Sequence, residues 1–481
     1  METGVILMNL LRTKSVEQMR AMADKSGMAK SLGAFDLMLL GIGGVIGTGI
    51  FVLTGVAAAK YAGPAVMLSF VISALACAFA GLAYAEFASI VPSSGSAYTY
   101  TYASLGEFIA FLVGWNLILE YTVTASAVAS GWSGYIVGLL KSAGIQLSPA
   151  LTLVPSDGGI INLPAILITV CLSFFLIRGT HESTKLNRIL VGVKLLAVFI
   201  FLLIAGPHVD TTNWTPFMPF GFQGVAGGAA IVFFAYIGFD AVATSAEECK
   251  NPSRDLPIGI IGSLVLCTIL YVAVAAVLTG VVPYTELNNA EPVAFALRYI
   301  GYNIGSALVG VGAVAGITTV LLIMLYGQAR IFFAMSRDGM VPAKICKIHP
   351  RYKTPYLVTL LGAVFVSLIS GFAPIGLIAE MANIGTLSAF TIAAIGVMVL
   401  RFTKPDLPRT FRCPAVGIIA PLAVLSCLYL MYNLPLDTWI RFFVWCFIGC
   451  IVYFSYSYKH SAVGRQTEES PAGKQEFSPL Q

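Results

Sequence analysis

Twelve apolar segments, each long enough to cross a lipid bilayer as a helix, run through this chain of 481 residues. A helix needs about 20 consecutive apolar residues to span the hydrocarbon core. Because 58% of the residues are hydrophobic and only 11% are charged, a soluble domain could not bury the apolar surface. The sequence therefore predicts an all-α polytopic membrane protein with 12 transmembrane helices, at residues 35–59, 63–90, 106–138, 163–178, 189–206, 222–247, 257–282, 303–334, 355–372, 375–400, 416–434 and 438–457.

The basic residues indicate the orientation, because cytoplasmic connections retain Lys and Arg. With a cytoplasmic N-terminus, most of the 28 basic residues fall on that side, while the outer side has only Lys60, Lys141, Arg298 and Arg441. We therefore expect a multi-pass plasma membrane protein with both termini in the cytoplasm. The formal charge of +5 lies beside the spans and is explained by topology and anionic lipid, so nucleic-acid binding is not expected.

The segments outside the spans carry no sizeable domain. Residues 1–34 are expected to form a cytoplasmic N-terminal tail, and 459–481, rich in Ser, Glu, Lys and Pro, a disordered cytoplasmic tail. The connection 335–354 fits either a short amphipathic helix on the membrane surface or an ordinary basic loop.

Cysteine and histidine show no ligand pattern. The nine cysteines lack metal-ligand spacing, and the four histidines lie in loops or near span ends. No nucleophile motif is present. We therefore expect no metal, no cofactor and no enzymatic activity.

The run LGIGGVIGTGIF, Leu40 to Phe51, is a poor membrane helix, because each glycine weakens a helix by roughly 1 kcal/mol relative to alanine. About 190 residues later, the sixth span is interrupted by FFAYIGFD, Phe233 to Asp240, and it enters from the opposite side. Two such interruptions in oppositely oriented halves indicate a transporter built from an inverted repeat. Alternatively, the small residues form a surface for close helix packing.

An interrupted helix has a chemical consequence. Unpaired N–H and C=O groups in hydrocarbon each cost several kcal/mol, so a polar ligand must satisfy them. The helix that begins near Gly49 would present N–H groups and a positive dipole to a carboxylate, and the carbonyl ends would suit an ammonium group. A zwitterionic amino acid matches both.

Four segments together resemble the amino acid–polyamine–organocation superfamily, and within it the cationic amino acid transporter family and its bacterial twelve-helix members. The segments are GIGGVIGTGIFVLTG, GPAVMLSFVISALACAFAGLAYAEFASIVPSSGSAYTY, FFAYIGFDAVATSAEECKNPSRDLPIGI and ITTVLLIMLYGQARIFFAMSRDGMVP, and the resemblance runs from about Leu32 to His460. It implies a LeuT-type 5+5 inverted repeat with helices 1 and 6 unwound at the midplane. The first repeat would be residues 35–206, the second 222–400, and helices 11 and 12 would occupy 416–457.

The resemblance also implies a substrate site for L-amino acids. The matching positions in the first break are Val45, Thr48 and Gly49, with the Thr48 and Gly49 amides on the carboxylate. In the sixth span the carbonyls of Phe234, Ala235 and Ile237 would hold the ammonium group, and Phe234 resembles an aromatic gate, although from its residue type alone it is an ordinary core side chain. The glycines expected in the unwound segments are Gly43, Gly44, Gly47 and Gly238.

Lys194 lies inside the fifth span, about six residues and roughly 9 Å past Arg188. A bare charge at that depth is expensive. The side chain could snorkel to the cytoplasmic interface, or it could lie against the first and eighth helices and load and release a proton. The resemblance favours proton coupling through Lys194, because proton-coupled bacterial members have a lysine here.

Three acids also fall within spans. Glu120 could pair with Lys194 in proton coupling or line the cavity wall. Asp240 fits a helix-capping role, and Glu86 a gate or interface position. Glu247 and Glu248 fall at a helix end and are expected to be solvated.

Met324 on the eighth span matches a family position that faces the substrate side chain, although helix packing explains it too. No motif places an intramembrane acid where it would neutralise a cationic side chain. We therefore expect proton-coupled symport of small neutral L-amino acids such as alanine by alternating access. Exchange, sodium coupling and uptake of arginine or lysine stay open, and an amino acid sensor is a remote alternative. The expected partners are the substrate and membrane lipid, with the protein itself a monomer.

Overall fold

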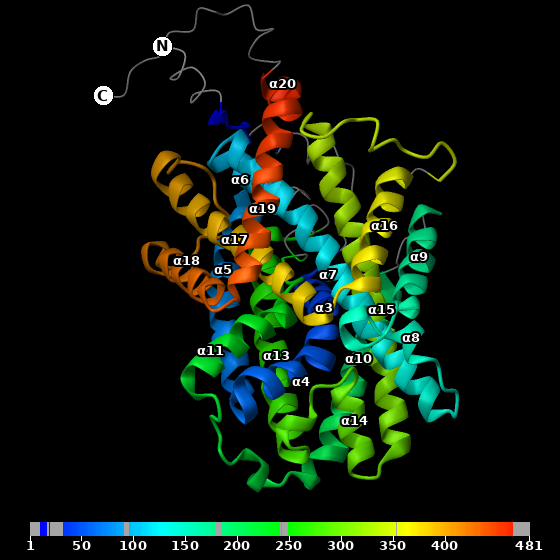
Figure 1. Cartoon of the computed structure of the whole chain (residues 1–481). Coiled ribbons are helices and arrows are strands. Elements are labelled where there is room, and N and C mark those ends of the chain that lie inside the picture. Colours follow the sequence, from blue (N-terminus) through cyan, green and yellow to red (C-terminus); the bar gives the residue numbers. More distant parts are fainter. Residues whose placement is uncertain are drawn as a thin grey trace, which may run out of the picture.

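A bundle of helices makes up the structure, which is a computed structural model (Figure 1). It describes residues 10–16, 19, 32–90, 96–178, 184–240, 242, 249–352 and 354–464. Within these residues there is no β-strand, only an isolated bridge between Leu32 and Cys249. The longer α-helices are α3 (Ala34–Val45), α5 (Val66–Ile90), α6 (Ser96–Ser104), α7 (Glu107–Ser142), α9 (Leu163–Ile177), α10 (Thr184–Ala205), α11 (Gly221–Val232), α13 (Pro252–Val281), α14 (Pro292–Tyr299), α15 (Asn303–Arg337), α16 (Tyr356–Phe372), α17 (Ile375–Thr403), α18 (Val416–Tyr432) and α19 (Leu436–Val452).

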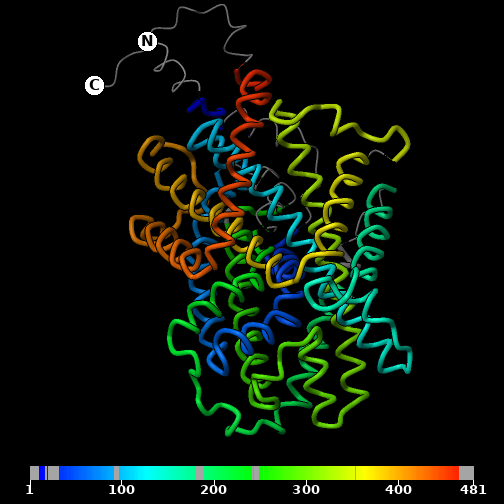
Figure 2. Tube along the Cα trace, viewed as in Figure 1, coloured from blue at the N-terminus to red at the C-terminus, as the bar shows by residue number. Residues whose placement is uncertain are grey.

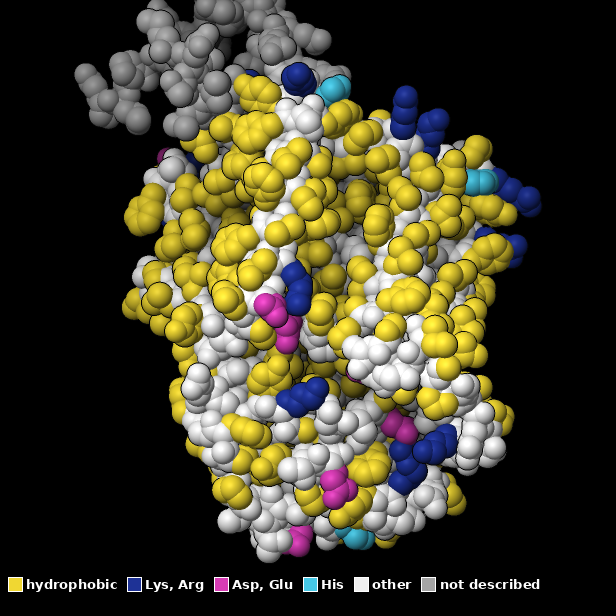
Figure 3. All heavy atoms as spheres, in the orientation of Figure 1, with side chains coloured by type: hydrophobic (Ala, Val, Ile, Leu, Met, Phe, Trp, Pro, Cys, Tyr) yellow, Lys and Arg dark blue, Asp and Glu magenta, His cyan; other side chains and the backbone are white. Residues whose placement is uncertain are grey.

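Seven helical runs in the described part are long and apolar enough to cross a membrane. Large apolar side chains on the outside of the bundle are strongly exposed, for example Leu203, Phe402 and Phe447, and Figure 3 shows a broad apolar surface with few charges on this face. Lipid is the solvent that such a surface needs. The prediction of a helical, multi-pass membrane protein is confirmed, while the count of twelve spanning helices stays a prediction. The seven runs are Gly49–Ile90, Glu107–Ser142, Arg188–His208, Arg254–Val281, Asn303–Arg337, Ile375–Thr403 and Leu436–Gly464.

Long helices cross in the interior around the segments that follow α3 and α11. Most of α7 and α17 is buried, whereas little of α19 is buried. Helix α7 packs along both α15 and α17, and α13 packs against α3 and α5. Figure 2 shows α3, in dark blue, at mid-height between these helices.

The first apolar segment changes direction after α3. That helix ends at Val45, and Ile46 is extended, with φ −74° and ψ 103°. Helical structure resumes in the π-helical turn η1 (Gly49–Leu53) and continues through α4 (Thr54–Ala57) and a second π-helical turn, η2 (Ala58–Ala62).

The sixth segment changes direction after α11. The helix tightens into the 3₁₀ turn η7 (Phe233–Tyr236), after which Ile237 is extended. Gly238 then takes φ +112°, a conformation that only glycine adopts without strain. Residues 241 and 243–248 lie outside the described part, so the expected cap at Asp240 and solvated ends at Glu247 and Glu248 are not tested.

The connection after α15 has no helix in its described residues. Residues 338–352 and 354 form turns, with Gly339 at φ +79°. Of the two alternatives for 335–354, the structure favours the loop. At the same end of the molecule lie η10 (Tyr453–Ser457), α20 (Tyr458–His460) and residues 10–16 (Figure 1).

Candidate functional site

The two direction changes meet in the interior. A Cβ added at Gly49 would overlap the backbone of Ala235, and one added at Gly44 would come within 3.0 Å of the Gly238 carbonyl oxygen. A Cβ at Gly47 would approach Val320 of α15 to 3.0 Å. These glycines therefore bring the segments after α3 and α11 into backbone contact, as the packing interpretation requires.

The same segments leave main-chain groups outside regular helix. The first turn of a helix has N–H groups with no intrahelical acceptor, and at the start of η1 these belong to the Thr48 and Gly49 region. On the other side, the Phe234 carbonyl accepts from the Ile237 amide at 3.2 Å. Close packing and main-chain groups outside regular helix thus occur together here.

Side chains from neighbouring helices satisfy several carbonyls at these breaks. Asn383 of α17 donates to the Ala230 and Ile231 oxygens at 2.7 and 3.2 Å, near the end of α11. The Tyr271 hydroxyl of α13 lies 3.0 Å from the Val45 oxygen and 2.9 Å from the Ala235 oxygen. One hydroxyl therefore reaches a carbonyl from each break.

Lys194 of α10 is fully buried and points at the end of α3. Its Nζ donates to the Gly43 and Ile46 oxygens at 2.7 and 3.1 Å, and to Thr319 Oγ1 of α15 at 3.1 Å. The side chain therefore does not snorkel to the interface. It lies against the first and eighth apolar segments, and the carbonyl ends of α3 stabilise its charge.

The Thr48 hydroxyl is buried and has no hydrogen-bond partner in the described part of the chain. The Thr48 side chain occupies the space that a Cβ at Gly131 of α7 would need. Glycine at position 131 therefore makes room for it. An unpaired buried hydroxyl is unfavourable by about 1–3 kcal/mol, which a ligand could recover.

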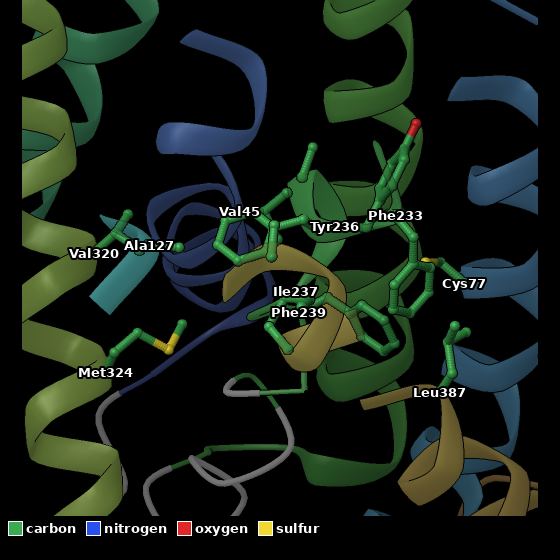
Figure 4. Close-up of a cluster of buried hydrophobic side chains, with 14 of the residues drawn as sticks. Val45, Cys77, Ala127, Phe233, Tyr236, Ile237, Phe239, Val320, Met324 and Leu387 are labelled. Atoms are coloured by element: carbon green, nitrogen blue, oxygen red, sulfur yellow. The ribbon is translucent and has the colours of Figure 1, made fainter. Parts of the chain in front are cut away.

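The other predicted contact residues form a buried apolar cluster. Figure 4 shows Val320 and Met324 on α15 pointing toward the interior, where Val45, Ile237 and Ala127 lie. Phe234 is buried as well. Val45, Ile237, Val320 and Met324 all belong to the buried hydrophobic core, which suits an apolar side chain.

Glu120 of α7 has different neighbours. It lies against Gly385 of α17, and Thr386 and Asp240 are near enough to influence its carboxyl group. It contacts α17, whereas Lys194 contacts α3 and α15. Pairing of Glu120 with Lys194 stays a prediction.

Further ionisable groups lie away from the breaks. Glu86 is buried beside Arg401 and Arg409, at 2.7 and 3.1 Å, as expected for an interface residue. Near α14, Glu291 pairs with Arg298 at 2.5 Å, and burial raises the Glu291 pKa although Arg298 partly offsets it. No group of three metal-ligating side chains occurs in the described residues.

Sequence reasoning missed Tyr271, Thr319 and Asn383. Each is a polar residue in an apolar helix, and such residues are expected to find an intramembrane partner. The sequence has many of them, and nothing along the chain indicates which ones reach the breaks.

Comparison with known proteins adds an independent finding. The family model described as "Amino acid permease" matches residues 32–461. The branched-chain amino acid permease BcaP of Bacillus subtilis is 50% identical over 95% of this chain and 99% of its own length. The methylthioribose transporter of the same organism is 47% identical over 95% of this chain and 100% of its own length. The vacuolar cationic amino acid transporter 4 of Arabidopsis thaliana is 37% identical over 83% of this chain and 68% of its own length.

Proposed function

Because the chain belongs to the amino acid permease family, we propose that it is a secondary active transporter that imports L-amino acids with apolar side chains by alternating access. It is a transporter and not an enzyme. The proposed architecture is the LeuT-type 5+5 inverted repeat with twelve transmembrane helices. In this arrangement the first repeat is 35–206, the second is 222–400, and helices 11 and 12 follow at 416–457.

The observation that carries the proposal is the contact between the two breaks inside the bundle. Main-chain N–H groups near Thr48 and Gly49 would take the carboxylate, and the carbonyls of Phe234, Ala235 and Ile237 the ammonium group. The unpaired Thr48 hydroxyl supports this assignment, because a bound carboxylate would supply its missing acceptor.

The proposed side-chain pocket is apolar. Met324, Val45 and Ile237 are buried in one hydrophobic cluster, which would disfavour a cationic side chain that lacks a nearby acid. Small neutral amino acids such as alanine fit these surroundings. The 50% identical relative named for branched-chain substrates extends the proposal to valine, leucine and isoleucine.

The proposed coupling ion is H⁺, carried by Lys194. Its ammonium group fills the space between α3 and α15, so a sodium ion would have to displace it. Glu120 is a second candidate because it is buried near another carboxylate. We further propose a monomer in the plasma membrane, with the end that holds α20 and residues 10–16 in the cytoplasm.

A binding screen followed by a transport assay tests the proposal. Purified protein is heated with each of the 20 amino acids and, because of the 47% identical relative, with methylthioribose. A ligand at about 100 times its Kd should add about 2.7 kcal/mol to the free energy of unfolding. Stabilisation by alanine or the branched-chain amino acids supports the proposal, whereas stabilisation by methylthioribose or arginine alone contradicts it.

Transport then distinguishes the coupling modes. In proteoliposomes, an imposed pH gradient without sodium should drive accumulation of the stabilising amino acid. Accumulation that requires sodium would contradict proton coupling, and counterflow without accumulation would indicate an exchanger.

A further inference from the structure

Tyr271 of α13 is in an unusual position for a buried tyrosine, because its hydroxyl reaches two carbonyls from segments far apart in sequence. The distances are 3.0 Å to the Val45 oxygen and 2.9 Å to the Ala235 oxygen. Val45 ends α3, and Ala235 lies in η7. The tyrosine therefore links the two breaks directly.

The ring of Tyr271 is held on two sides, so its hydroxyl has a defined position. The side chain is fully buried, and its ring centre lies 5.4 Å from those of Phe70 and Tyr236. Rings packed at such distances restrict each other's rotation. The hydroxyl is thus fixed by α13, α5 and η7 together.

Hydrogen-bond capacity shows what this link leaves available. A tyrosine hydroxyl has a single proton, so it donates to only one of the two carbonyls at a time, and each carbonyl has two lone pairs. In a continuous helix the Val45 oxygen would accept from Gly49, but α3 has already ended. Both carbonyls therefore keep acceptor capacity while the hydroxyl holds them close together.

We propose that Tyr271 is a positioning residue that holds the Val45 and Ala235 carbonyls together so that both receive the ammonium group of the substrate. This inference rests on the proposed function. The ammonium group has three N–H donors and no acceptor, so a pair of convergent carbonyls suits it better than a single one. Without the hydroxyl, the two like dipoles repel and the carbonyls turn apart.

The decisive experiment compares a ligand that has the ammonium group with one that lacks it. L-valine and its 2-hydroxy analogue share the carboxylate and side chain. Dissociation constants for both are measured on purified full-length protein, unsubstituted and with Tyr271→Phe. We expect Tyr271→Phe to raise the dissociation constant of L-valine about tenfold and that of the hydroxy acid less than twofold.

Tyr453→Phe is the matched control, because it also removes a buried tyrosine hydroxyl, one that donates to Glu107 at 3.0 Å at the far end of α7. It should leave the ratio of the two constants unchanged. Should Tyr271→Phe not fold, Phe70→Leu removes one of the rings that position Tyr271 and should give the same selective loss to a smaller extent.

The outcomes separate the inference from the proposed function. Equal weakening of both ligands by Tyr271→Phe means that the tyrosine has only a structural role, and this overturns the inference alone. If unsubstituted protein binds neither L-valine nor any other amino acid, the proposed function fails and the inference with it.

Discussion

Lys194 illustrates how main-chain carbonyls can stabilise a buried charge. Its Nζ donates to two main-chain oxygens at the end of α3 and to the Thr319 hydroxyl. Carbonyl dipoles at a helix C-terminus stabilise a cation by up to about 2 kcal/mol when partly buried. Loss of the proton would remove the charge that these dipoles stabilise and one of the three N–H donors, so we expect protonation of Lys194 to strengthen its contacts with α3.

Lys194→Ala should therefore abolish accumulation driven by a pH gradient while counterflow exchange persists. The alanine leaves the Gly43 and Ile46 carbonyls without their cation but removes no group proposed to contact the substrate. The measurement is uptake of the stabilising amino acid into proteoliposomes, with Lys141→Ala, an exposed lysine, as the control. Concentrative uptake by Lys194→Ala would refute the coupling proposal.

Met324→Ser tests the side-chain pocket. Serine is shorter and more polar than the buried methionine, so the substitution leaves more space beside the substrate side chain and makes that space more polar. Larger or cationic amino acids should therefore compete for uptake. The measurement is inhibition of labelled substrate uptake by each amino acid, with Met218→Ser, an exposed methionine outside the bundle core, as the control. An unchanged competition profile would remove Met324 from the pocket and leave helix packing as its role.

At the scale of single residues, the sequence predicted the contacts of Lys194 better than those of Tyr271. A lysine in RILVGVKLLAVF stands out in an apolar span, and the family pattern indicated the helices it contacts. Tyr271, in LCTILYVAV, is one of 20 tyrosines in the chain. Its proposed role depends on the hydrogen bonds of its hydroxyl with the Val45 and Ala235 oxygens. The sequence around Tyr271 does not indicate contacts with segments so far away along the chain.

At the scale of elements, the two breaks are stabilised by each other. Gly44 near the end of α3 and Gly49 after it meet the backbone of Gly238 and Ala235, which follow α11. Side chains of α13 and α17 then supply donors to the freed carbonyls. In hydrocarbon, an interrupted helix is stable only where such partners form hydrogen bonds with its free main-chain groups.

Gly49→Ala tests whether this close approach matters. The added methyl group would collide with the Ala235 backbone, which cannot move away as a flexible side chain could. We expect a destabilisation of about 1–3 kcal/mol and loss of amino acid binding. Thermal unfolding and ligand-induced stabilisation are measured together.

Gly192→Ala on α10 is the matched control, because a Cβ there meets nothing within 4 Å. Alanine should be neutral or stabilising by up to about 1 kcal/mol in this helix. If the two variants behave alike, the contact at Gly49 has no special importance.

The sequence predicted the elements unevenly for identifiable reasons. Long apolar runs such as those of α7, α15 and α17 are recognisable because lipid imposes their length and composition. The sequence leaves the connection after α15 open between helix and loop, because its basic residues suit either one. Its turns depend on Gly339 and on contacts such as that of Thr354 with the Ile177 oxygen, at 2.6 Å, which join distant segments.

Across the whole molecule, residues 10–16 bind the end that we assign to the cytoplasm. Lys14 Nζ donates to Asp338 Oδ1 at 2.7 Å, and Tyr98 donates to the other oxygen at 3.0 Å. The Lys14 amide donates to the Tyr102 oxygen, and the Ala462 amide to the Asp338 oxygen. The sequence predicted only a solvated tail before residue 35, because none of these partners is near Lys14 along the chain.

Residues 10–16 and 457–464 thus meet at the C-terminal end of α15. Nearby, the buried Glu107 carboxylate accepts from Tyr102, Tyr453 and Ser461, which joins α6 and α7 to residues 453–461. Opening of this end during transport would have to break at least the contacts that cross from residues 10–16 to α15. The Lys14–Asp338 contact is an ion pair.

Lys14→Ala should therefore loosen this end of the molecule. Asp338 would keep Tyr98 but lose its cation, and removing one partner of a buried ion pair costs on the order of 3 kcal/mol. Hydrogen exchange should accelerate in residues 96–104 and 453–464, with little change in α13 and α14, which lie away from the pair. Lys459→Ala, which replaces an exposed lysine on α20, should change the free energy of unfolding by less than about 0.5 kcal/mol and leave exchange unaltered. Equal exchange in the two variants would mean that the pair does not hold this end closed, whereas acceleration throughout the chain would indicate general destabilisation instead of local opening.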